Sequence, residues 1–570
     1  MTTTATTAKE RPSRIAFGSC NSQNLTQPLW KVVSSRNPTA FVWAGDAIYA
    51  DWHMGKEPLT FPPKAIFASA TPSILQNYYQ KQLANPDYQS FLQTTNATIF
   101  GTIDDHDMGM NNGDETYPYR VEAGLEFLKF VNEPPHSPFY NRVKKRGGGG
   151  VYGVKVFDFD RPTNLVSDFD AGIDPDVVGY DNSNVEWNYS KKSVAIFVLD
   201  VRTNKTPWKE GFQGWTPDYQ GDFLGETQWK WFETAIARSK ATVNVIVSGL
   251  QIHPYRFPDA NANEMWSHFP TSRQRLYDTI LSSGAQSPIL VSGDVHLSQI
   301  MRKDCVDSLS INDYDTPIPS SSFHKRPLVE VTTSGMTHSW GTCFSSKPKF
   351  HNGWSLQSIY ARLSSNSFMN FAHVILPMPD LVVTTPPTEN QPQQQPNQQD
   401  RSDTLFENGG ADGGKVGKQF SLELNFAEME FDWDNEILSL RVFGKNQDAP
   451  PLLGARYHFD QLSGKQAMPG GSVKATVSSM DKDTPSIHPD AFKYQMDGDL
   501  TGNGRWICTN HKGVSNPLHV YGGYAIMSTF CATIFLLPQV VFSILIYKCW
   551  RRQTSKFHNA RREGADKKNL

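Results

Sequence analysis

Short runs of apolar residues recur along the chain, and glycine or polar residues bound each of them. Runs of this length with such boundaries are typical of buried β-strands. Several runs end in side chains that can carry chemistry, which ordinary turns do not require. These runs are RIAFGSC (14–20), TAFVWAGDAIYAD (39–51), TIFGTIDDHD (98–107), SVAIFVLDVR (193–202), VNVIVSGLQIHP (243–254), PILVSGDVH (288–296) and PLVEVTTSGMTHS (327–339).

Helical patterns separate some of these runs. GETQWKWFETAIARSK (225–240) precedes the run at 243, and SRQRLYDTILSSGA (272–285) precedes the run at 288. Alternating strands and helices predict βαβ units and a layered α/β body, in which ligands bind at the carboxyl ends of the strands. Residues 420–434 and 437–445 are predicted to be antiparallel strands that close a sheet.

The apolar pattern changes near the C-terminus. Residues 521–547 contain no charged side chain, and this length is enough to span a bilayer core of about 30 Å. A buried core helix is the alternative, and the length argues against it. We therefore predict a single transmembrane helix at 521–547, with the lipid bilayer as its partner.

Other segments have too few apolar residues for a folded core. The predicted organisation is a disordered N-terminus (1–13), a main domain (14–465), an irregular region and stalk (466–520), and a basic tail (548–570). Within the main domain, residues 384–418 are rich in Pro, Gln, Asn and Gly, and we expect a disordered low-complexity insertion there.

Composition narrows the class of protein. Hydrophobic residues make up 38% of the 570 residues, which excludes a disordered chain. The formal net charge is −3, so a nucleic-acid-binding role is not expected. The six cysteines are too few for a disulfide scaffold, and they show no zinc-binding spacing. The sequence does not determine how the cysteines outside the C-terminal apolar segment pair, which are Cys20, Cys305, Cys343 and Cys508.

Charge also orients the predicted membrane helix. The tail has eight Lys or Arg against two acids, which places it in the cytosol and the main domain outside or in a lumen. Four glycosylation sequons, at Asn24, Asn96, Asn188 and Asn204, agree with a glycoprotein. The start MTTTATTAKERPSR contains no signal-peptide-like apolar run. Two explanations follow: the start is truncated relative to the natural product, or the protein is a cytosolic, tail-anchored adaptor.

The acidic strand ends predict a metal site. Asp46 and Tyr49 follow one run, DDHD at 104–107 follows another, and Asp294 with His296 follows a third. Carboxylates crowded in this way repel one another unless cations lie between them. Oxygen ligands suit Ca, Mg, Mn or ferric iron, and imidazole and thiolate extend the range to Fe and Zn. Two such metals can activate water and clamp a phosphate ester.

Each motif alone also has an ordinary structural interpretation. A Gly-Asp turn is common, the DDHD acids can cap a helix, and Cys20 can be a small buried residue or half of a disulfide. His253 and His338 can be hydrogen-bonded core histidines, although His253 is also a candidate substrate contact. Arg202 is a candidate for gripping phosphoryl oxygens. The joint order of the motifs favours the metal site.

This order resembles the alkaline phosphatase D (PhoD-like) metallophosphatases of the calcineurin-like superfamily, over residues 14–450 without the insertion. The similar strings are RIAFGSC, FVWAGDAIYAD, GTIDDHDMGMNNGD, FVLDVRTNK, LGETQWKWFE, SGLQIHP, VSGDVHLSQI, VEVTTSGMTHSW, NFAEMEFDWD and LSLRVFGK. The resemblance implies an α/β, four-layer αββα sandwich and hydrolysis of phosphate monoesters, phosphodiesters or both.

The resemblance also implies roles for individual residues. Its ferric-iron ligands fall on Cys20, Asp46 and Tyr49, and Asp104 or Asp105 with Asp294 and His296 complete a dinuclear or trinuclear site, with Ca²⁺ beside Fe³⁺. His106 matches a general acid near the leaving oxygen. The chain departs from the family pattern at Ala47, Ile103 and Met108, where polar residues, Trp and Tyr are usual, which bears on substrate preference and rate.

We therefore predict a membrane-anchored phosphoesterase in which a metal-bound hydroxide attacks phosphorus. Arg202, His106 and His296 are the predicted catalytic groups, and monoesters and diesters remain rival substrates. The alternative is a catalytically impaired pseudoenzyme that acts as a tethered binding or scaffold protein, a reading that Ala47 favours.

Overall fold

A computed structural model of the chain divides into two compact units, one of residues 1–362 and 376–514 and one of residues 363–375 and 515–570. The second unit is described only at Ala525, Ser528 and Lys548, which are helical. In the first unit the structure describes residues 13–56, 65–145, 149–161, 165–167, 173–176, 189–211, 214–254, 264–307, 325–342, 380–381, 420–465 and 505–509.

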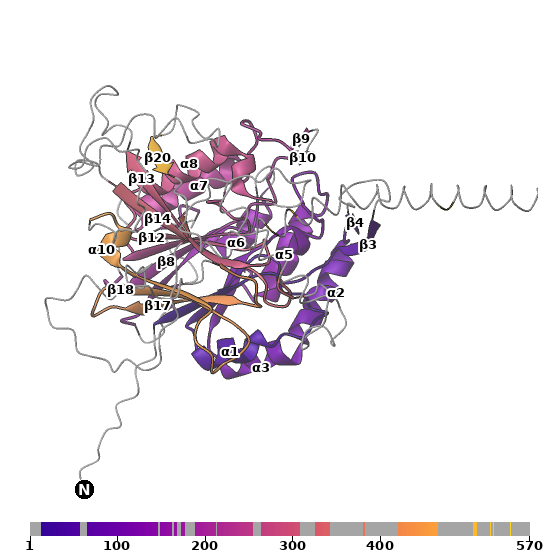
Figure 1. The fold of residues 1–570 in the computed structure, drawn as a ribbon, viewed down its shortest axis with the longest axis horizontal. Coiled ribbons are helices and arrows are strands. Elements are labelled where there is room, and N and C mark those ends of the chain that lie inside the picture. The colour runs from indigo at the N-terminus through magenta and orange to yellow at the C-terminus, as the bar shows by residue number, and fades with distance from the viewer. Residues whose placement is uncertain are drawn as a thin grey trace, which may run out of the picture. The chain divides into compact units, whose positions relative to one another are not determined.

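Two mixed sheets organise the first unit (Figure 1). The first has the order β19-β18-β17-β1-β2-β5, and the second the order β15-β13-β14-β12-β11-β8-β6-β7, with β16 and β20 also paired to β13. The first sheet contains β1 (Arg14–Gly18), β2 (Ala40–Ala44), β5 (Thr98–Thr102), β17 (Phe426–Asp432), β18 (Ile437–Phe443) and β19 (Leu453–His458). The second contains β6 (Gly153–Asp158), β7 (Leu165–Ser167), β8 (Ser193–Leu199), β11 (Val243–Ser248), β12 (Pro288–Ser292), β13 (Ser298–Asp307), β14 (Lys325–Thr333), β15 (Asp380–Leu381), β16 (Phe420–Ser421) and β20 (Trp506–Thr509).

Helices lie outside both sheets, with α1 and α3 on one side and α7 and α8 on the other (Figure 1). The larger helices are α1 (Leu29–Arg36), α2 (Pro72–Leu83), α3 (Pro86–Thr94), α5 (Arg120–Phe130), α7 (Gly225–Arg238) and α8 (Pro270–Ser282). The shorter elements are α4 (Asp105–Met108), α6 (Pro138–Val143), α10 (Phe459–Leu462), the 3-10 helix η1 (Trp266–His268), and the hairpins β3 (Trp52–Lys56) with β4 (Ala65–Ala68) and β9 (Glu210–Gly211) with β10 (Gly214–Trp215).

Strand β8 shows why the apolar runs of the sequence do not alternate between apolar and polar residues. Its residues Val194, Ile196 and Val198 belong to the core shared with the first sheet. The intervening Ala195, Phe197 and Leu199 belong to the core shared with α7 and α8. Both faces are covered, so every position is apolar, as buried parallel strands require. The prediction of a layered α/β body with two sheets is confirmed.

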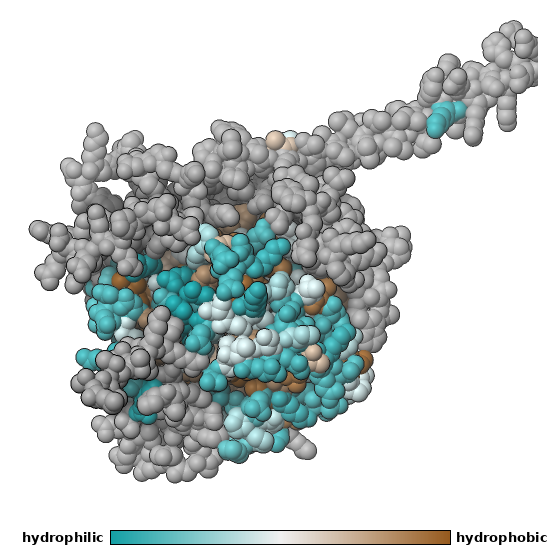
Figure 2. All heavy atoms as spheres, turned by 90° about the horizontal axis from the view of Figure 1, so that it is seen from below, coloured by the Kyte–Doolittle hydropathy of each residue, from teal (hydrophilic) through white to brown (hydrophobic). Residues whose placement is uncertain are grey.

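Aromatic rings fix the helices on the outer face of the first sheet. The Trp30 ring of α1 lies 4.8 Å from Phe41 and 5.5 Å from Trp43, both on β2. The same ring lies 4.9 Å from Phe91 of α3, in a stacked arrangement. Contacts of this kind stabilise a core beyond the burial of their area. The surface shown in Figure 2 is, by contrast, mainly hydrophilic where it is described.

Parallel pairing brings the ends of the apolar runs to one edge of each sheet. Strands β1, β2 and β5 run parallel, as do β8, β11, β12 and β14. Strands β17 and β18 extend the first sheet antiparallel, as predicted. The candidate functional residues therefore follow the carboxyl ends of their strands, where ligands bind in α/β proteins.

The segment expected to be an irregular stalk differs from that prediction at one place. Residues Trp506–Thr509 form β20, which pairs antiparallel with β13. A disulfide joins Cys508 of β20 to Cys305 of β13, and the Trp506 indole donates to Ser282 Oγ of α8 at 2.9 Å. The surrounding glycine- and serine-rich sequence hides this short strand, because its pairing partner lies 203 residues away.

Two predicted segments cannot be compared with the structure. The insertion at 384–418 lies outside the described residues, and so does nearly all of 521–547. Within the described part of the chain, no helix has both the length and the apolarity needed to cross a membrane.

The Cys305–Cys508 disulfide closes a loop of more than 200 residues, so its removal should destabilise the domain by about 2–5 kcal/mol. We expect the double variant Cys305→Ser/Cys508→Ser to unfold at a lower guanidinium concentration than the wild-type chain. Reduction should lower the wild-type midpoint to that of the variant and leave the variant unchanged. Equal midpoints for all four samples would contradict the bond.

Candidate metal centre

Four of the predicted ligands have a left-handed backbone. Cys20, Asp46, Asp294 and His296 have φ values of 56°, 53°, 67° and 56°, a region that side chains other than glycine rarely adopt. Only nine non-glycine residues of the described chain have a positive φ. Strain of this kind persists where the surroundings enforce it, and it concentrates at functional sites.

Glycines let the turns approach one another closely. A Cβ atom at Gly45 would lie 2.4 Å from the Asp104 Cβ, and one at Gly249 would lie 2.9 Å from the Asp104 Cγ. At Gly293, a Cβ atom would lie 2.5 Å from the Ala44 carbonyl oxygen. The Gly-Asp pairs at 45–46 and 293–294 thus have a packing reason, since any side chain at either glycine would separate the turns.

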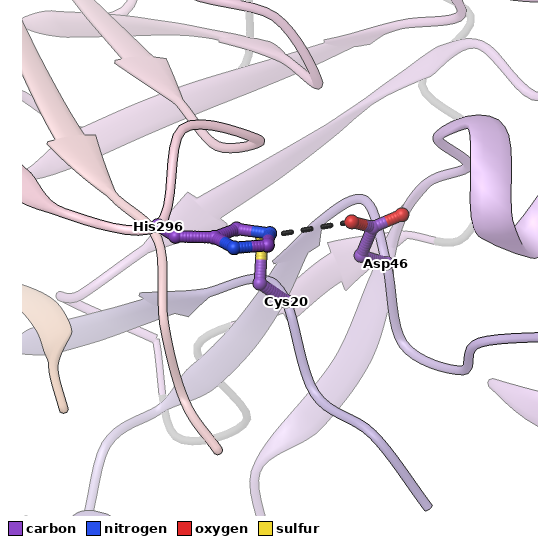
Figure 3. A group of neighbouring side chains, drawn as sticks. All are labelled: Cys20, Asp46 and His296. Carbon is purple, nitrogen blue, oxygen red and sulfur yellow. Dashed lines mark hydrogen bonds between the residues drawn. The ribbon is translucent and has the colours of Figure 1, made fainter. Parts of the chain in front are cut away.

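The first ligand group joins both sheets. Cys20, Asp46 and His296 point toward one another from the ends of β1, β2 and β12, and their donor atoms lie within 4.8 Å of one another (Figure 3). The Cys20 Sγ lies 3.5 Å from Asp46 Oδ2. The Tyr49 hydroxyl lies 3.1 Å from both Asp46 Oδ2 and His296 Nε2. Thiol, carboxylate, imidazole and phenol therefore converge here, a donor set that suits iron.

Ser334, which follows β14, orients this group. Its Oγ accepts a hydrogen bond from the His296 backbone N–H at 2.6 Å and lies 2.9 Å from the Cys20 Sγ. Because Oγ accepts from the backbone, its own hydrogen can point toward the sulfur. That bond lowers the pKa of Cys20, although burial and the Asp46 charge together hold it well above its usual value. A cation in the group would favour the thiolate.

Two further groups continue from the first, each sharing one carboxylate with the next. Asp104, Asp105 and Asp294 form one, and Asp46, Asp105 and His106 form the other, each with donor atoms within 4.8 Å. Asp46 belongs to two of the three groups, and so does Asp105. Shared carboxylates can bridge neighbouring cations, so the arrangement suits two or three metal ions better than one.

The buried carboxylates of the centre have few cations near them. Burial, with nearby carboxylates, raises the pKa of Asp46 and of Asp294 well above the usual range and raises that of Asp104 to about 6. The pKa of Asp105 is lowered despite burial, because His106 and Arg202 lie nearby. Among the carboxylates of the three ligand groups, as far as the structure describes them, two buried oxygens have no hydrogen-bond partner: Asp46 Oδ1 and Asp104 Oδ2. Such oxygens fit metal ligation, since unpaired buried polar atoms are otherwise unfavourable.

His106 is oriented by Asp51. The His106 Nδ1 lies 2.5 Å from Asp51 Oδ1, and the imidazole stacks on the Tyr49 ring at 4.0 Å. Although burial lowers the pKa of His106, the carboxylates of Asp105, Asp51 and Asp46 raise it well above its usual value. The AGDAIYAD string contains Asp51, but only the structure shows its partner.

The acid Asp107 holds the turns around His106. It accepts hydrogen bonds from the backbone N–H groups of Ala47 and Asp104 at 3.0 and 3.1 Å, and from the Tyr79 hydroxyl at 3.0 Å. With Asp104 it forms the capping box of α4. Asp107 is therefore a structural acid within the DDHD motif, in line with the capping interpretation for this position.

The structure changes the predicted role of Arg202. Its guanidinium is fully buried and bonds Asp104 through Nε. Nη1 donates to Glu264 Oε1 at 2.8 Å, and Nη2 lies 3.7 Å from Asp105 Oδ1. Because carboxylates already occupy the guanidinium, it is better placed to orient Asp104 than to grip phosphate. Glu264 was missed, since its segment NANEMWSHF has neither strand nor helix periodicity.

The prediction that His253 contacts substrate is corrected. Its side chain is fully buried, with Nδ1 3.1 Å from the Tyr277 hydroxyl and Nε2 2.9 Å from the Leu328 carbonyl oxygen. Both ring nitrogens are engaged in the core between β14 and α8. The alternative interpretation, a hydrogen-bonded core histidine, describes His253. The position of His253 after strand β11 does not by itself determine whether its side chain points to the metal groups or into the core.

His338 lies beside the metal groups. Its ring is 4.9 Å from Tyr49 and 4.5 Å from His296, and its Nδ1 lies 2.9 Å from the Thr337 hydroxyl.

The three residues that depart from the family pattern belong to the hydrophobic core. They are Ala47, Ile103 and Met108, and each is fully buried among apolar residues. Their effect on substrate would therefore be indirect.

Burial raises the pKa of Asp107 to about 7, so the folded state holds this proton more tightly than the unfolded state does. Its contribution to stability is present at low pH and is lost as pH rises through about 7. In chelated protein, the stability of wild type relative to Asp107→Asn should fall between pH 4 and 7, by at most about 1.4 kcal/mol per pH unit. Chemical denaturation at several pH values measures this difference. A difference that grows with pH would contradict it.

The chain was compared with curated proteins, solved structures and protein families. A search of curated proteins gave no match. A solved structure titled "Structure of PhoD" is 15% identical, with a TM-score of 0.38, and the alignment covers 58% of this chain and 58% of that one. Residues 191–345, which contain Arg202, Asp294 and His296, match the family described as PhoD-like phosphatase. Over these residues, the chain is similar to the PhoD-like phosphatases.

Proposed function

We propose that the chain hydrolyses phosphate esters at a metal centre built on the calcineurin-like αββα arrangement. The family match supports a hydrolase that acts on phosphoesters. The observation that carries the metal dependence is the overlap of three ligand groups through Asp46 and Asp105. No single cation close to one group could compensate the carboxylates of all three.

The donor types suggest which ion each group holds. Cys20, Asp46, Tyr49 and His296 would hold ferric iron, since thiolate and phenolate are strong anionic donors. Asp104, Asp105 and Asp294 offer only carboxylate oxygens, which suit Ca²⁺. Bound ions supply activation of water and stabilisation of the charge that develops on the phosphoryl oxygens.

The chain's own residues supply the proton and the orientation. Asp51 engages Nδ1 of His106, so Nε2 is the atom that can give a proton to the leaving oxygen. Arg202 fixes Asp104 through its buried ion pair. His296 lies with Nε2 at the Tyr49 hydroxyl, inside the first ligand group, which favours a ligand role over the predicted catalytic one.

Several observations support a main domain outside the cytosol, anchored by the helix predicted at 521–547. Disulfides persist in oxidising compartments, and Cys305–Cys508 is a disulfide. The sequon residues Asn24 and Asn96 are exposed. Asn204 is partly buried and donates its side-chain amide to the Gly149 carbonyl at 2.8 Å, so it is a poor acceptor.

Two substitutions in one loop separate metal binding from proton transfer. Asp46→Asn should remove bound metal and lower phosphoesterase activity roughly 10²-fold or more, because a ligand shared by two groups is lost. Asp51→Asn should keep the metal and lower kcat about 10²-fold for an alkyl phosphate, whose leaving oxygen needs a proton. With p-nitrophenyl phosphate, a good leaving group, Asp51→Asn should change little. Metal analysis and steady-state kinetics on the same samples measure both effects.

Either of two results would refute this assignment. An Asp46→Asn chain with full metal content and activity would remove Asp46 from the centre. An equal loss for both leaving groups in Asp51→Asn would argue against a protonating role for His106.

Glycosylation tests the location. In a eukaryotic secretory host, glycosidase treatment should increase the gel mobility of the full chain. Asn24→Gln and Asn96→Gln should each reduce that shift, whereas Asn204→Gln, whose amide is hydrogen-bonded, should not. A chain that shows no shift in any form would favour the cytosolic, tail-anchored alternative.

A further inference from the structure

Trp340 is an exposed tryptophan in a protein that buries most of its described indoles. Its side chain is 41% exposed, whereas Trp30, Trp43, Trp229 and Trp266 are at most 1% exposed. The described residues include few exposed large hydrophobic side chains, which are Leu92, Tyr119, Val121, Tyr219 and Trp340. Exposure of a single side chain is ordinary, but an exposed indole leaves apolar area that a bound apolar group would cover.

The turn that carries two predicted ligands also fixes Trp340. The Trp340 indole N–H donates to the Val295 carbonyl oxygen at 2.8 Å. Its backbone N–H donates to the His296 carbonyl oxygen at 3.0 Å. The backbone bond therefore holds the residue on the Gly-Asp-Val-His turn, and the ring cannot turn away without breaking the indole bond.

Two further hydrogen bonds hold the loop to Leu422. The Ser339 hydroxyl donates to the Leu422 carbonyl oxygen at 2.6 Å, and the Gly341 N–H donates to the same oxygen at 2.9 Å. A Cβ atom at Gly341 would lie 2.2 Å from that oxygen, so only glycine permits the approach. Trp340 thus lies between two anchored neighbours, which pre-organises its ring.

The same turn belongs to the partly exposed side of the centre, together with Tyr49 and His106. Asp294, Val295 and His296 are each partly exposed, while Asp104 and Asp105 are buried. His338, two residues before Trp340, contacts both Tyr49 and His296. A substrate that reaches the metal groups from their exposed side therefore meets the loop of Trp340.

We propose that Trp340 is a specificity-determining residue that stacks on a planar, aromatic group of the phosphoester substrate. This inference rests on the proposed phosphoesterase function and adds the class of its organic group. The metal centre would bind the phosphoryl oxygens, and the rigid indole would provide an apolar face beside them. Stacking of a planar group on an aromatic side chain is favourable by about 1–3 kcal/mol, measured by substituting the aromatic residue with alanine.

Binding of non-hydrolysable analogues tests the proposal. Titration calorimetry on the metal-loaded full chain would compare phenylphosphonate with methylphosphonate, which share the phosphoryl group and differ in the ring. Wild type should bind phenylphosphonate about tenfold more tightly. Trp340→Ala should bring this ratio close to one without changing the affinity for methylphosphonate. Trp340→Phe, which keeps a ring and loses the N–H donor, should retain most of the ratio.

The outcomes separate this inference from the function on which it rests. A ratio near one in wild type, or a ratio that survives Trp340→Ala, would overturn the role of Trp340 and leave the phosphoryl site intact. A loss of affinity for both analogues in Trp340→Ala would make the residue structural and overturn the proposal. If wild type binds neither analogue, the phosphoesterase function itself fails, and the proposal fails with it. Leu92→Ala, which removes an exposed side chain from α3, should behave as wild type.

Discussion

Repulsion among buried carboxylates is the constraint on which the site depends. Asp46, Asp104, Asp105 and Asp294 converge from three turns, and the cations facing them, Arg202 and His106, are too few to balance the charge. Unbalanced buried charge is unfavourable, so the group must take up protons or bind cations. The raised pKa values of Asp46, Asp104 and Asp294 correspond to the uptake of protons when no cation is bound. The oxygens Asp46 Oδ1 and Asp104 Oδ2, which accept no hydrogen bond, indicate the binding of cations.

The fold maintains this convergence by making the turns rigid. Both sheets are packed through a common core, so the carboxyl ends of β1, β2, β5 and β12 have fixed relative positions. Glycines at 45, 249 and 293 allow the turns to touch, and four ligands adopt the left-handed backbone that this contact requires. Pre-organisation of this kind places the strain in the folded protein, so that ligand binding need not create it.

The sequence predicted the parts of the site that a strand end determines. Cys20, Asp46, Asp105, Asp294 and His296 follow apolar runs, and parallel strands bring such residues together whatever the loops do. It failed where the face of a side chain or a distant partner decides. His253 follows a strand, but its side chain points into the core. Arg202 is hydrogen-bonded to Glu264, which lies in a segment whose sequence shows no helix or strand periodicity. Strand β20 pairs with β13 and is joined to it by a disulfide, whose pairing no spacing reveals.

Direct measurement of bound metal in the purified full chain tests the central claim. Elemental analysis, with anomalous diffraction to locate the ions, should find at least two metal ions per chain. One should lie among Cys20, Asp46 and His296, and another among Asp104, Asp105 and Asp294. A correctly folded chain that binds no metal at either place, even after incubation with iron and calcium, would contradict the account.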